Sequence, residues 1–261
     1  MADFSSLVAS GAFDGAQFTL EISDDWMQGR TTYGGMSSAL CLETAMRVFP
    51  DLPPLRSAMV SFIGPAGGKV TGEARILRQG KSVTFVEADL IAEKGLATRA
   101  IFVFGAERES RLNDVYVKAP DLPAPDECEM YSPDGFGPGF FRQFDTRLAK
   151  GARIFAGADE QDHWLWVRHR DSVATGPVAL LALADAPPPA AAPMLSEIAM
   201  NSSVTWQVNF IGDGAYDVGD WRLIQTRAEA AAGGYSSQDM SIWNFDRTLL
   251  ATMRQSVAIF A

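Results

Sequence analysis

The chain has 261 residues, of which 47% are hydrophobic and 21% are charged, and its formal net charge is −10. This length and apolar fraction are enough for two hydrophobic cores, each built from roughly 130 residues. A general affinity for nucleic acid or for an anionic membrane would act against the negative field of the whole molecule. The composition is therefore typical of a globular protein whose partners are neither nucleic acids nor membranes.

The sequence predicts no membrane span and no secretory signal. Its most apolar stretch, residues 178–195, is interrupted by Asp185 and three consecutive prolines, whereas a span needs ~20 apolar residues. Residues 1–6 lack a basic region followed by an apolar run. Cys41 and Cys128 stand apart, without the spacing of a metal site or a disulfide framework. We expect a cytoplasmic protein that uses neither a metal nor a cofactor.

The first part of the chain predicts one helix followed by four strands. Residues 33–49 form the helix, which begins at Gly34 and Gly35. Its apolar residues cover more than one stripe, so we expect it to be buried on most sides. Strands are expected at residues 55–63, 70–77, 82–92 and 96–104, with turns that contain glycine or proline between them.

The second part repeats this order of elements after a linker at residues 111–140, which is rich in proline and glycine. We expect two domains, 1–110 and 141–261, joined by that linker. The predicted elements are strands at 152–156 and 163–168, a helix at 173–185, and strands at 203–211, 221–231, 237–244 and 249–260. The turn after residue 211 is expected at Gly212, Asp213 and Gly214.

A mostly apolar helix next to an antiparallel meander has few ways to bury both surfaces. The sheet must curl around the helix, and two such units side by side would pair their sheets. The sequence therefore predicts an α+β fold with two antiparallel sheets, each wrapped around a central helix.

Most familiar catalytic motifs are absent from the sequence. There is no GxxxxGK[ST] phosphate loop and no HExxH zinc motif, and the segment around Ser37 lacks the last glycine of a GxSxG nucleophile elbow. The two histidines, His163 and His169, lie in a segment that alternates like a strand. We expect both to be satisfied or exposed strand residues, so catalysis by a Ser–His pair is not expected.

Asp185 is the first of three unusual positions. It falls in the last turn of a predicted helix, where the helix dipole disfavours a carboxylate by ~0.3–1 kcal/mol. One interpretation is a solvated acid that precedes a proline loop. The other is a functional carboxylate.

The strand that begins at Ser203 alternates apolar and polar residues, and Ser203, Thr205, Gln207 and Asn209 share its polar face. That face either meets solvent or lines a wet cleft. Both interpretations remain open from the pattern alone.

Gln255 is the third unusual position, because the period of its strand places it on an apolar face with Met253, Val257 and Ile259. A buried amide costs free energy unless its donors and its acceptor are all matched, by another strand, a substrate or an ordered water. Carboxylate, hydroxyl and amide together can hold and polarise a water molecule. That chemistry suits hydrolysis of an activated ester better than hydrolysis of an amide.

Four segments carry a resemblance to a known family. They are residues 28–36 leading into the first helix, residues 77–82 with the sequence LRQGKS, residues 221–224, and the closing strand with Gln255. In their order and spacing the chain resembles the acyl-CoA thioesterase II family and its wider thioesterase-like relatives, which are double hot-dog proteins. The resemblance covers most of the chain and is weakest in the linker.

The resemblance implies hydrolysis of acyl-CoA thioesters to a carboxylic acid and CoA by a water bound to an Asp, a Ser or Thr, and a Gln. Asp185, Ser203 and Gln255 match these positions, and Ser202 and Thr205 are alternatives for the hydroxyl. The acyl chain is expected in an apolar tunnel between the central helices and their sheets. Backbone N–H groups near Gly34 and Gly35, or near Gly176, would stabilise the oxyanion.

CoA is anionic, so an acidic protein needs local cations to bind it. Arg78, Lys81 and Arg99 are candidates, although solvated surface charge is the simpler interpretation of each. The expected partner is the acyl-CoA substrate, and exposed edge strands also favour a homodimer. Two alternative functions remain: a non-catalytic acyl-CoA-binding protein, and a hot-dog enoyl-CoA hydratase, which would need an Asp–His pair near a helix.

Overall fold

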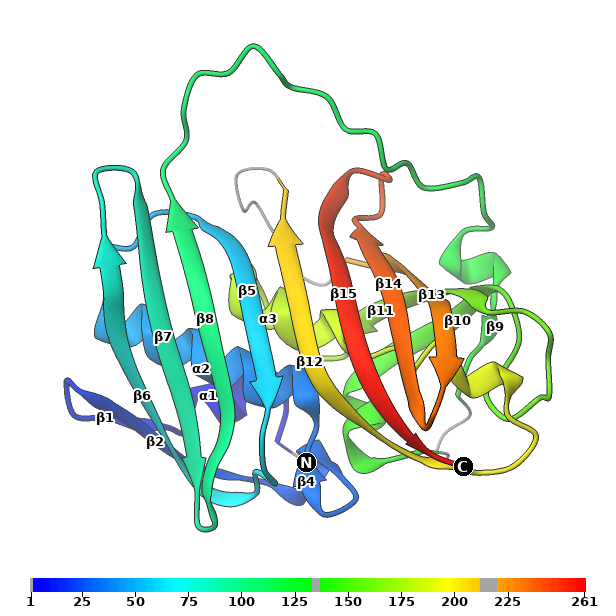
Figure 1. Ribbon diagram of the computed structural model, residues 1–261, viewed down its shortest axis with the longest axis horizontal. Coiled ribbons are helices and arrows are strands. Elements are labelled where there is room, and N and C mark those ends of the chain that lie inside the picture. The colour runs from blue at the N-terminus through cyan, green and yellow to red at the C-terminus, as the bar shows by residue number, and fades with distance from the viewer. Residues whose placement is uncertain (1, 133–136, 212–219) are drawn as a thin grey trace.

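One continuous antiparallel sheet forms the framework of the molecule (Figure 1). The structure is a computed structural model that describes residues 2–132, 137–211 and 220–261. The expected turn at Gly212, Asp213 and Gly214 lies outside these residues, as do Pro133 and Gly135 of the expected linker. Within the described part, thirteen strands follow the order β1-β2-β6-β7-β8-β5-β12-β15-β14-β13-β11-β10-β9.

The N-terminal half of the sheet consists of β1 (Ala12–Phe13), β2 (Gln17–Ile22), β5 (Leu55–Phe62), β6 (Gly68–Gln79), β7 (Val83–Ala92) and β8 (Gly95–Gly105). The C-terminal half consists of β9 (Glu129–Met130), β10 (Phe144–Lys150), β11 (Asp162–His169), β12 (Met200–Phe210), β13 (Arg222–Ala232), β14 (Tyr235–Trp243) and β15 (Leu249–Phe260). Two short strands, β3 (Met27–Gln28) and β4 (Thr31–Thr32), form a separate hairpin.

The two expected sheets are in fact one, and this corrects the sequence prediction. Strands β5 and β12 pair antiparallel from Ser57 opposite Asn209 to Ser61 opposite Thr205. An unpaired strand edge leaves a row of N–H and C=O groups without partners. The pairing of β5 with β12 satisfies both inner edges, and it buries Val60 and Trp206 side by side on the concave face.

The two halves of the sheet have the same strand order when they are followed outward from this seam. On one side the order is β5, β8, β7, β6 and β2, and on the other it is β12, β15, β14, β13 and β11. The irregularities next to the seam also correspond, because β5 shifts register against β8 between Leu55 and Ser57, and β12 shifts against β15 between Ser203 and Thr205. The described structure therefore repeats one unit of architecture.

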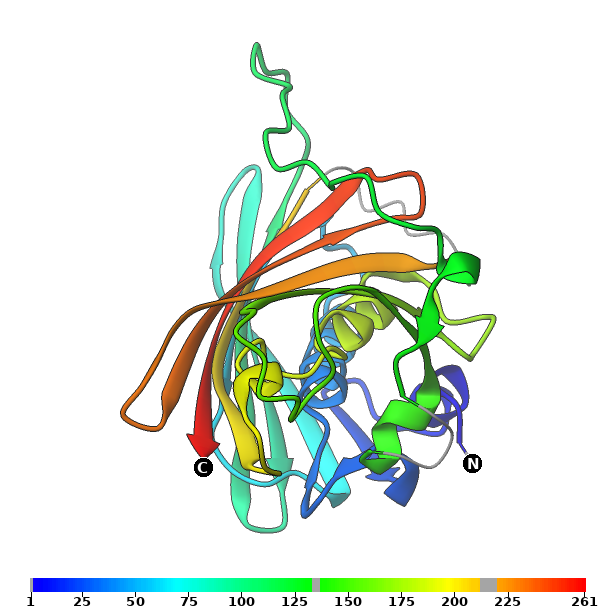
Figure 2. The ribbon, with the colours of Figure 1, turned by 90° about the vertical axis from the view of Figure 1, so that its right-hand side faces the viewer.

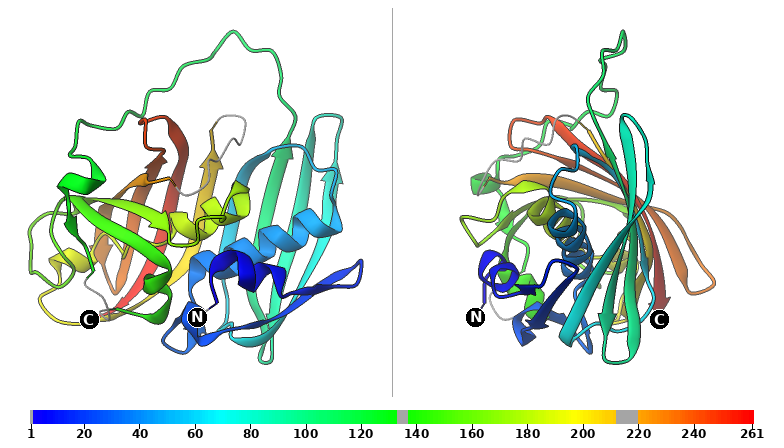
Figure 3. Two further views of the ribbon diagram at one scale, coloured as in Figure 1. Left: turned by 180° about the vertical axis from the view of Figure 1, so that it is seen from behind. Right: turned by 90° about the vertical axis from the view of Figure 1, so that its left-hand side faces the viewer.

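Two central helices lie on the concave face of the sheet, which curls around them (Figures 2 and 3). Helix α2 (Gly34–Val48) is buried on most sides, as its sequence predicts, and all residues from Gly35 to Leu42 are buried. Helix α3 (Gly176–Ala184) has seven buried residues out of nine. It begins later than predicted because Pro177 stands in its first turn, where a missing backbone N–H is tolerated.

Several short elements differ from the prediction. The expected strand at 152–156 is wrong: Gly151 and Phe155 both have positive φ angles, which interrupt an extended strand. The strands β1, β2, β9 and β10, and the short helix α1 (Phe4–Ala9), were not expected from periodicity. Four 3₁₀ segments complete the described elements: η1 (Asp24–Trp26), η2 (Pro125–Glu127), η3 (Gly139–Gln143) and η4 (Ala192–Met194).

The segment between β8 and η2 crosses from one half of the molecule to the other as an extended loop without regular structure (Figure 1). Trp166 on β11 anchors its far end by donating a hydrogen bond from Nε1 to the carbonyl of Pro123, at 2.9 Å. Among the helices that the structure describes, none combines the length and the hydropathy that crossing a membrane requires.

A substitution at Gly72 can test how closely β6 packs on α2. A Cβ atom at this position would lie 2.1 Å from Oγ1 of the buried Thr44. We expect Gly72→Ala to lower the free energy of unfolding by about 1–3 kcal/mol through overpacking, measured by denaturant titration. Gly67→Ala is the matched control, because its new methyl would meet the movable end of Met27. Equal stability of the two variants would contradict the packing described here.

Candidate functional site

Three polar side chains from distant parts of the sequence meet beneath the sheet. Nε2 of Gln255 donates hydrogen bonds to Oδ1 of Asp185 at 2.7 Å and to Oγ of Ser203 at 3.0 Å. The structure thus brings together the carboxylate, the hydroxyl and the amide that the sequence analysis singled out. They come from the end of α3, from the start of β12 and from the middle of β15.

Asp185 lies where the end of α3 meets the start of α2. It is the residue that follows the last turn of α3, where the helix dipole alone would disfavour its charge. The backbone N–H of Gly35, in the first turn of α2, donates to its carboxylate. The N-terminus of α2 therefore offsets the unfavourable dipole that the C-terminus of α3 presents to the Asp185 carboxylate.

Close contact between the two helices requires glycine at the start of α2. A Cβ atom on Gly34 would lie 2.8 Å from Oδ2 of Asp185, and one on Gly35 would lie 2.4 Å from the carbonyl oxygen of Ala182. Tyr33 also connects the start of α2 to the end of α3, because its hydroxyl donates a hydrogen bond to the carbonyl of Ala182 at 2.7 Å. A side chain at Gly34 would displace the carboxylate, and one at Gly35 would push α2 away from α3.

Burial raises the pKa of Asp185 from 3.8 to about 7, while the hydrogen bonds from Gln255 and from the N–H of Gly35 act in the opposite direction. A carboxyl group with a pKa near neutrality exchanges its proton readily at physiological pH, which is the property that a general base needs. The position of Asp185 therefore provides a basic group without a histidine.

Ser203 reaches the site because of the irregularity in β12. The pairing of β12 with β15 shifts register between Ser203 and Thr205. Asn201 and Ser203 precede the shift and line cavities, whereas Thr205, Gln207 and Asn209 follow it and are exposed. The polar face expected from strict alternation is thus divided: its first member lines a cavity and the others meet solvent. Neither alternative hydroxyl bonds to Gln255, since Thr205 points outward and Ser202 donates to the Ser203 carbonyl.

Gln255 is 4% exposed and lies on the buried face of β15, and all of its hydrogen-bonding groups are matched. Its Oε1 accepts a hydrogen bond from Nε2 of Gln238 at 2.7 Å, and Oε1 of Gln238 accepts one from the backbone N–H of Ala190 at 2.8 Å. A peptide N–H can only donate, so Ala190 fixes the orientation of Gln238, and Gln238 fixes that of Gln255. This amide chain directs Nε2 of Gln255 toward Asp185 and Ser203.

A cavity of about 660 Å³ opens beside these three groups, and we call it the aromatic cavity. Its walls include five aromatic rings, a run of three prolines, Asp185, Ser203 and Gln255. Two of the rings, Tyr33 and Phe140, stack in parallel with centroids 4.0 Å apart. The five aromatic residues are Tyr33, Tyr131, Phe140, Phe141 and Phe155.

A second cavity of about 580 Å³, which we call the hydroxyl cavity, reaches the same point from the other side. Three residues, Gln28, Asn201 and Ser203, line both cavities, and Gly34 at the start of α2 lines the second. The hydroxyl-bearing residues of its wall are Thr31, Thr32, Ser37, Thr98, Ser202 and Ser203. The polar groups around Ser203 therefore lie at the junction of two spaces of different character.

Neither histidine lies beside Asp185. Both are buried on β11, where His163 pairs with the hydroxyl of Thr226 and Nε2 of His169 lies 2.9 Å from the carbonyl oxygen of Ala179. Burial lowers the pKa of each histidine to about 4. They line neither cavity, and their interactions are those of core residues.

Gly176, expected as one source of oxyanion-binding N–H groups, begins α3, whereas Asp185 follows its end. Asp185 stands nine positions after Gly176 along the helix, about 13 Å along the axis. Gly176 lines neither cavity. The N–H groups at the start of α2 are therefore the ones near the site.

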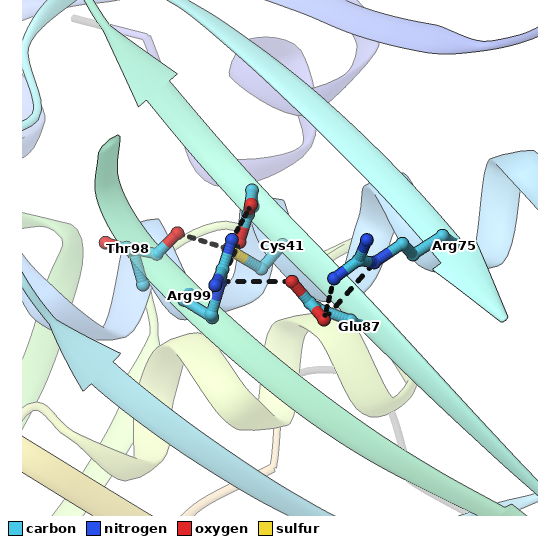
Figure 4. A network of polar contacts seen from close by, with 6 residues as sticks. Cys41, Arg75, Glu87, Thr98 and Arg99 are labelled. Atoms are coloured by element: carbon cyan, nitrogen blue, oxygen red, sulfur yellow. Dashed lines mark hydrogen bonds and ion pairs between the residues drawn. The ribbon is translucent and has the colours of Figure 1, made fainter. Parts of the chain in front are cut away.

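The cations considered from the sequence lie elsewhere. Arg99 donates two hydrogen bonds to Asp89 and pairs with Glu87, which Arg75 also contacts (Figure 4). Arg78 and Lys81 flank the turn between β6 and β7, at the end of β7 remote from the cavities. Within the described residues, no group of three or more His, Cys, Asp or Glu side chains is arranged to hold a metal ion.

Gln238 was not identified from the sequence as part of this arrangement, and neither was the contact of Gly34 and Gly35 with Asp185. Gln238 carried the same signal as Gln255, because the alternation of its strand places it on the buried face with Met240 and Ile242. For Gly34 and Gly35 the sequence showed where a helix begins, but the contact with Asp185 depends on tertiary structure.

Comparison with solved structures defines the class of protein as hot-dog. A conserved hot-dog protein of unknown function from Alicyclobacillus acidocaldarius is 25% identical, with a TM-score of 0.88 over 98% of this chain and 97% of that one. A TesB protein of Mycobacterium avium subsp. paratuberculosis is 16% identical, with a TM-score of 0.80 over 98% and 99%. The acyl-CoA thioesterase II TesB2 of Mycobacterium marinum is 16% identical, with a TM-score of 0.75 over 96% and 95%.

The particular family follows from sequence profiles. The profile of the acyl-CoA thioesterase N-terminal domain matches residues 22–105, and the profile of the C-terminal domain matches residues 120–259. The chain therefore belongs to the acyl-CoA thioesterase family, and it is a thioesterase. No curated protein matches this sequence.

The raised pKa of Asp185 predicts a specific dependence of stability on pH. Between pH 4 and pH 7 the carboxyl group holds its proton in the folded state and loses it in the unfolded state, so folding is progressively disfavoured as the pH rises. Asp185→Asn removes this effect. We expect the stability of the variant relative to the original protein to increase between pH 4 and pH 7, by at least ~1.4 kcal/mol, the value of one pKa unit.

Denaturant titrations of both proteins at several pH values measure this difference. Asp14→Asn is the control, because Asp14 is solvated and its pKa is lowered by hydrogen bonds from the backbone at Gln17 and Ala16. A difference between Asp185→Asn and the original protein that stays constant across this pH range would rule out the raised pKa.

Proposed function

We propose that this protein hydrolyses acyl-CoA thioesters by means of a water molecule activated by Asp185, Ser203 and Gln255. The main support is that Nε2 of Gln255 holds a carboxylate oxygen and a hydroxyl oxygen at 2.7 and 3.0 Å, at the wall of a cavity. Acyl transfer to water needs a base for the water proton and donors for the developing oxyanion. The groups around the junction of the two cavities supply both.

In this mechanism Asp185 takes the proton of the water, and its pKa near 7 suits that role at physiological pH. Ser203 orients the water toward the thioester carbonyl, since Gln255 already occupies its oxygen and leaves the hydroxyl proton to donate. The N–H of Gly35 is bonded to Asp185, so the remaining N–H groups at the start of α2 stabilise the developing negative charge, which the helix dipole also favours. The thiolate of CoA then leaves as the tetrahedral intermediate collapses.

Gln255 contributes mainly by holding the other two groups. Its amide donates to Asp185 and Ser203 and accepts from Gln238, so its hydrogen-bonding capacity is filled before substrate binds. A water that contacts Gln255 directly must replace one of these bonds. The amide thus sets the distance between the base and the hydroxyl and stabilises the charged form of Asp185.

The aromatic cavity is the site we propose for the acyl group. It lies next to Asp185, and its walls of aromatic rings and prolines offer an apolar surface to a hydrocarbon chain. From the sequence we expect the acyl chain between the central helices and the sheet; in our proposal, η3 and the loop that follows β10 also enclose it.

A hot-dog hydratase would require a histidine paired with an acid near the substrate. His163 and His169 line neither cavity, and both are engaged with Thr226 and with a backbone carbonyl. The hydratase interpretation therefore has less support than hydrolysis. A non-catalytic binding protein would have no use for a carboxylate held near neutrality beside a hydroxyl.

Replacing the base tests the mechanism. We expect Asp185→Asn to reduce thiol release from acyl-CoA by about 10²–10⁴-fold, the usual contribution of a general base. In the original protein, kcat/KM should rise with pH and level off above about pH 7, as Asp185 loses its proton. An N-acetylcysteamine thioester is the better substrate for this profile, because the phosphate of CoA itself titrates near pH ~6. Full activity of Asp185→Asn would eliminate this role.

Gln238 tests the amide chain without touching the three central groups. A carboxylate in Gln238→Glu accepts from the N–H of Ala190 but cannot donate to Oε1 of Gln255. Gln255 must then turn its oxygen toward Asp185. We expect kcat/KM to fall by about 10–100-fold, the cost of one or two lost hydrogen bonds to a charged group.

The acid limb of the pH profile should also move upward in Gln238→Glu, because Asp185 loses a donor and gains a nearby negative charge. Gln207→Glu is the matched control, with the same chemical change on the exposed face of β12. A folded Gln238→Glu protein with the activity and pH profile of the control would show that the amide chain does not orient Gln255.

A further inference from the structure

The hydroxyl cavity carries two cationic residues and no acid among the described residues that line it. Arg30 lies in the turn between β3 and β4, and Lys94 lies in the turn between β7 and β8. Both are exposed, and neither forms an ion pair with a described acid. In a chain with a net charge of −10, a cavity whose charged lining residues are all cations is an unusual local environment.

We propose that the hydroxyl cavity binds the phosphate-bearing arm of CoA, with Arg30 and Lys94 contacting its phosphates. This inference rests on the proposed thioesterase function and assigns the two sides of the substrate to two different spaces. It also names cations that the sequence pattern did not indicate.

The connection between the cavities supports this assignment. The acyl group and the thiol arm leave a thioester in different directions, and the bond to be cleaved must lie near Ser203. Gln28, Asn201 and Ser203 line both cavities, so a substrate that passes this junction places one part in each. Side-chain amides of Gln28 and Asn201 at that point can bond to the carbonyl and amide groups of the extended arm.

The charged groups of the aromatic cavity point to the same orientation. Arg153 is the cation there, and its guanidinium already contacts the backbone carbonyls of Tyr131 and Met130, as well as Glu129. Asp185 adds negative charge on that side. An anionic arm is therefore better accommodated by Arg30 and Lys94 than by the aromatic cavity.

The wall of the hydroxyl cavity matches the mixed chemistry of the arm. Its threonine and serine residues offer donors and acceptors, and Phe62, Ile63 and Pro65 offer apolar surface. Ile63 is 55% exposed, which is unusual for an isoleucine that serves only the core. An adenine ring or the hydrocarbon part of the arm would cover such a residue.

The test compares two thioesters with the same acyl group, one of CoA and one of N-acetylcysteamine, which has no phosphate. In the double variant Arg30→Glu/Lys94→Glu, we expect the ratio of kcat/KM for the CoA thioester to kcat/KM for the short thioester to fall about tenfold, or ~1.4 kcal/mol. The rise of KM for acyl-CoA with ionic strength should also be weaker in the variant. Structural damage would lower both values of kcat/KM together and leave their ratio unchanged.

The control is Arg78→Glu/Lys81→Glu, which makes the same change of charge beyond the far end of β7. That strand has ten residues and spans about 33 Å, so these cations are remote from the hydroxyl cavity. Its ratio should equal that of the original protein. If the ratio falls equally in the control and in Arg30→Glu/Lys94→Glu, the effect comes from net charge and the proposed site is wrong.

Calorimetric titration with CoA and with pantetheine, which lacks the phosphates, separates this inference from the proposed function. We expect the Kd for CoA to rise about tenfold in Arg30→Glu/Lys94→Glu and the Kd for pantetheine to stay the same. If the original protein hydrolyses neither thioester, the proposed function fails, and the titration still decides the binding site. Unchanged affinity for CoA would overturn the assignment of Arg30 and Lys94.

Discussion

The contact between the start of α2 and the end of α3 determines the geometry on which the site depends. Each helix is contributed by a different half of the chain, and they meet so closely that Gly34 and Gly35 have no room for a side chain. That contact places Asp185 against the N–H groups of α2. Without it the carboxylate would lie at the negative end of its own helix with nothing to offset the cost of burial.

A second constraint acts through the sheet. The backbone at Ala190, Gln238 on β14 and Gln255 on β15 form a chain of hydrogen bonds with a single direction, because its first donor is a peptide N–H. Burial makes each of these bonds costly to lose. The helix contact therefore fixes the carboxylate, and the amide chain fixes the group that faces it. Neither the helix contact nor the amide chain includes a histidine or a metal.

Much of this arrangement could be predicted from the sequence, since Asp185 and Gln255 stand where the local pattern disfavours them and Ser203 begins the polar face of its strand. Hydrophobic periodicity also located α2, α3 and the long strands. The sequence predicts that the two units pair their sheets, but it does not identify the strands that pair, because the pairing of β5 with β12 leaves no local signal. The register shift after Ser203 could not be predicted either, because apolar and polar residues alternate regularly in the sequence while the strand pairing is interrupted between Ser203 and Thr205. The division into domains 1–110 and 141–261 stays a prediction.

The repeated architecture leads to a last consequence. The approximate twofold symmetry that exchanges β5 and β12 makes Ser57 the counterpart of Thr205. With the matching register shifts, the counterparts of Ser203, Gln255 and Gln238 are then Leu55, Phe102 and Val86. All three N-terminal counterparts are hydrophobic, and all are buried. A fold with approximate twofold symmetry thus offers two equivalent places for polar chemistry, and this chain has filled one of them with hydrocarbon. In the function we propose, the C-terminal half of the duplication carries the reacting groups, and the N-terminal half serves as their scaffold.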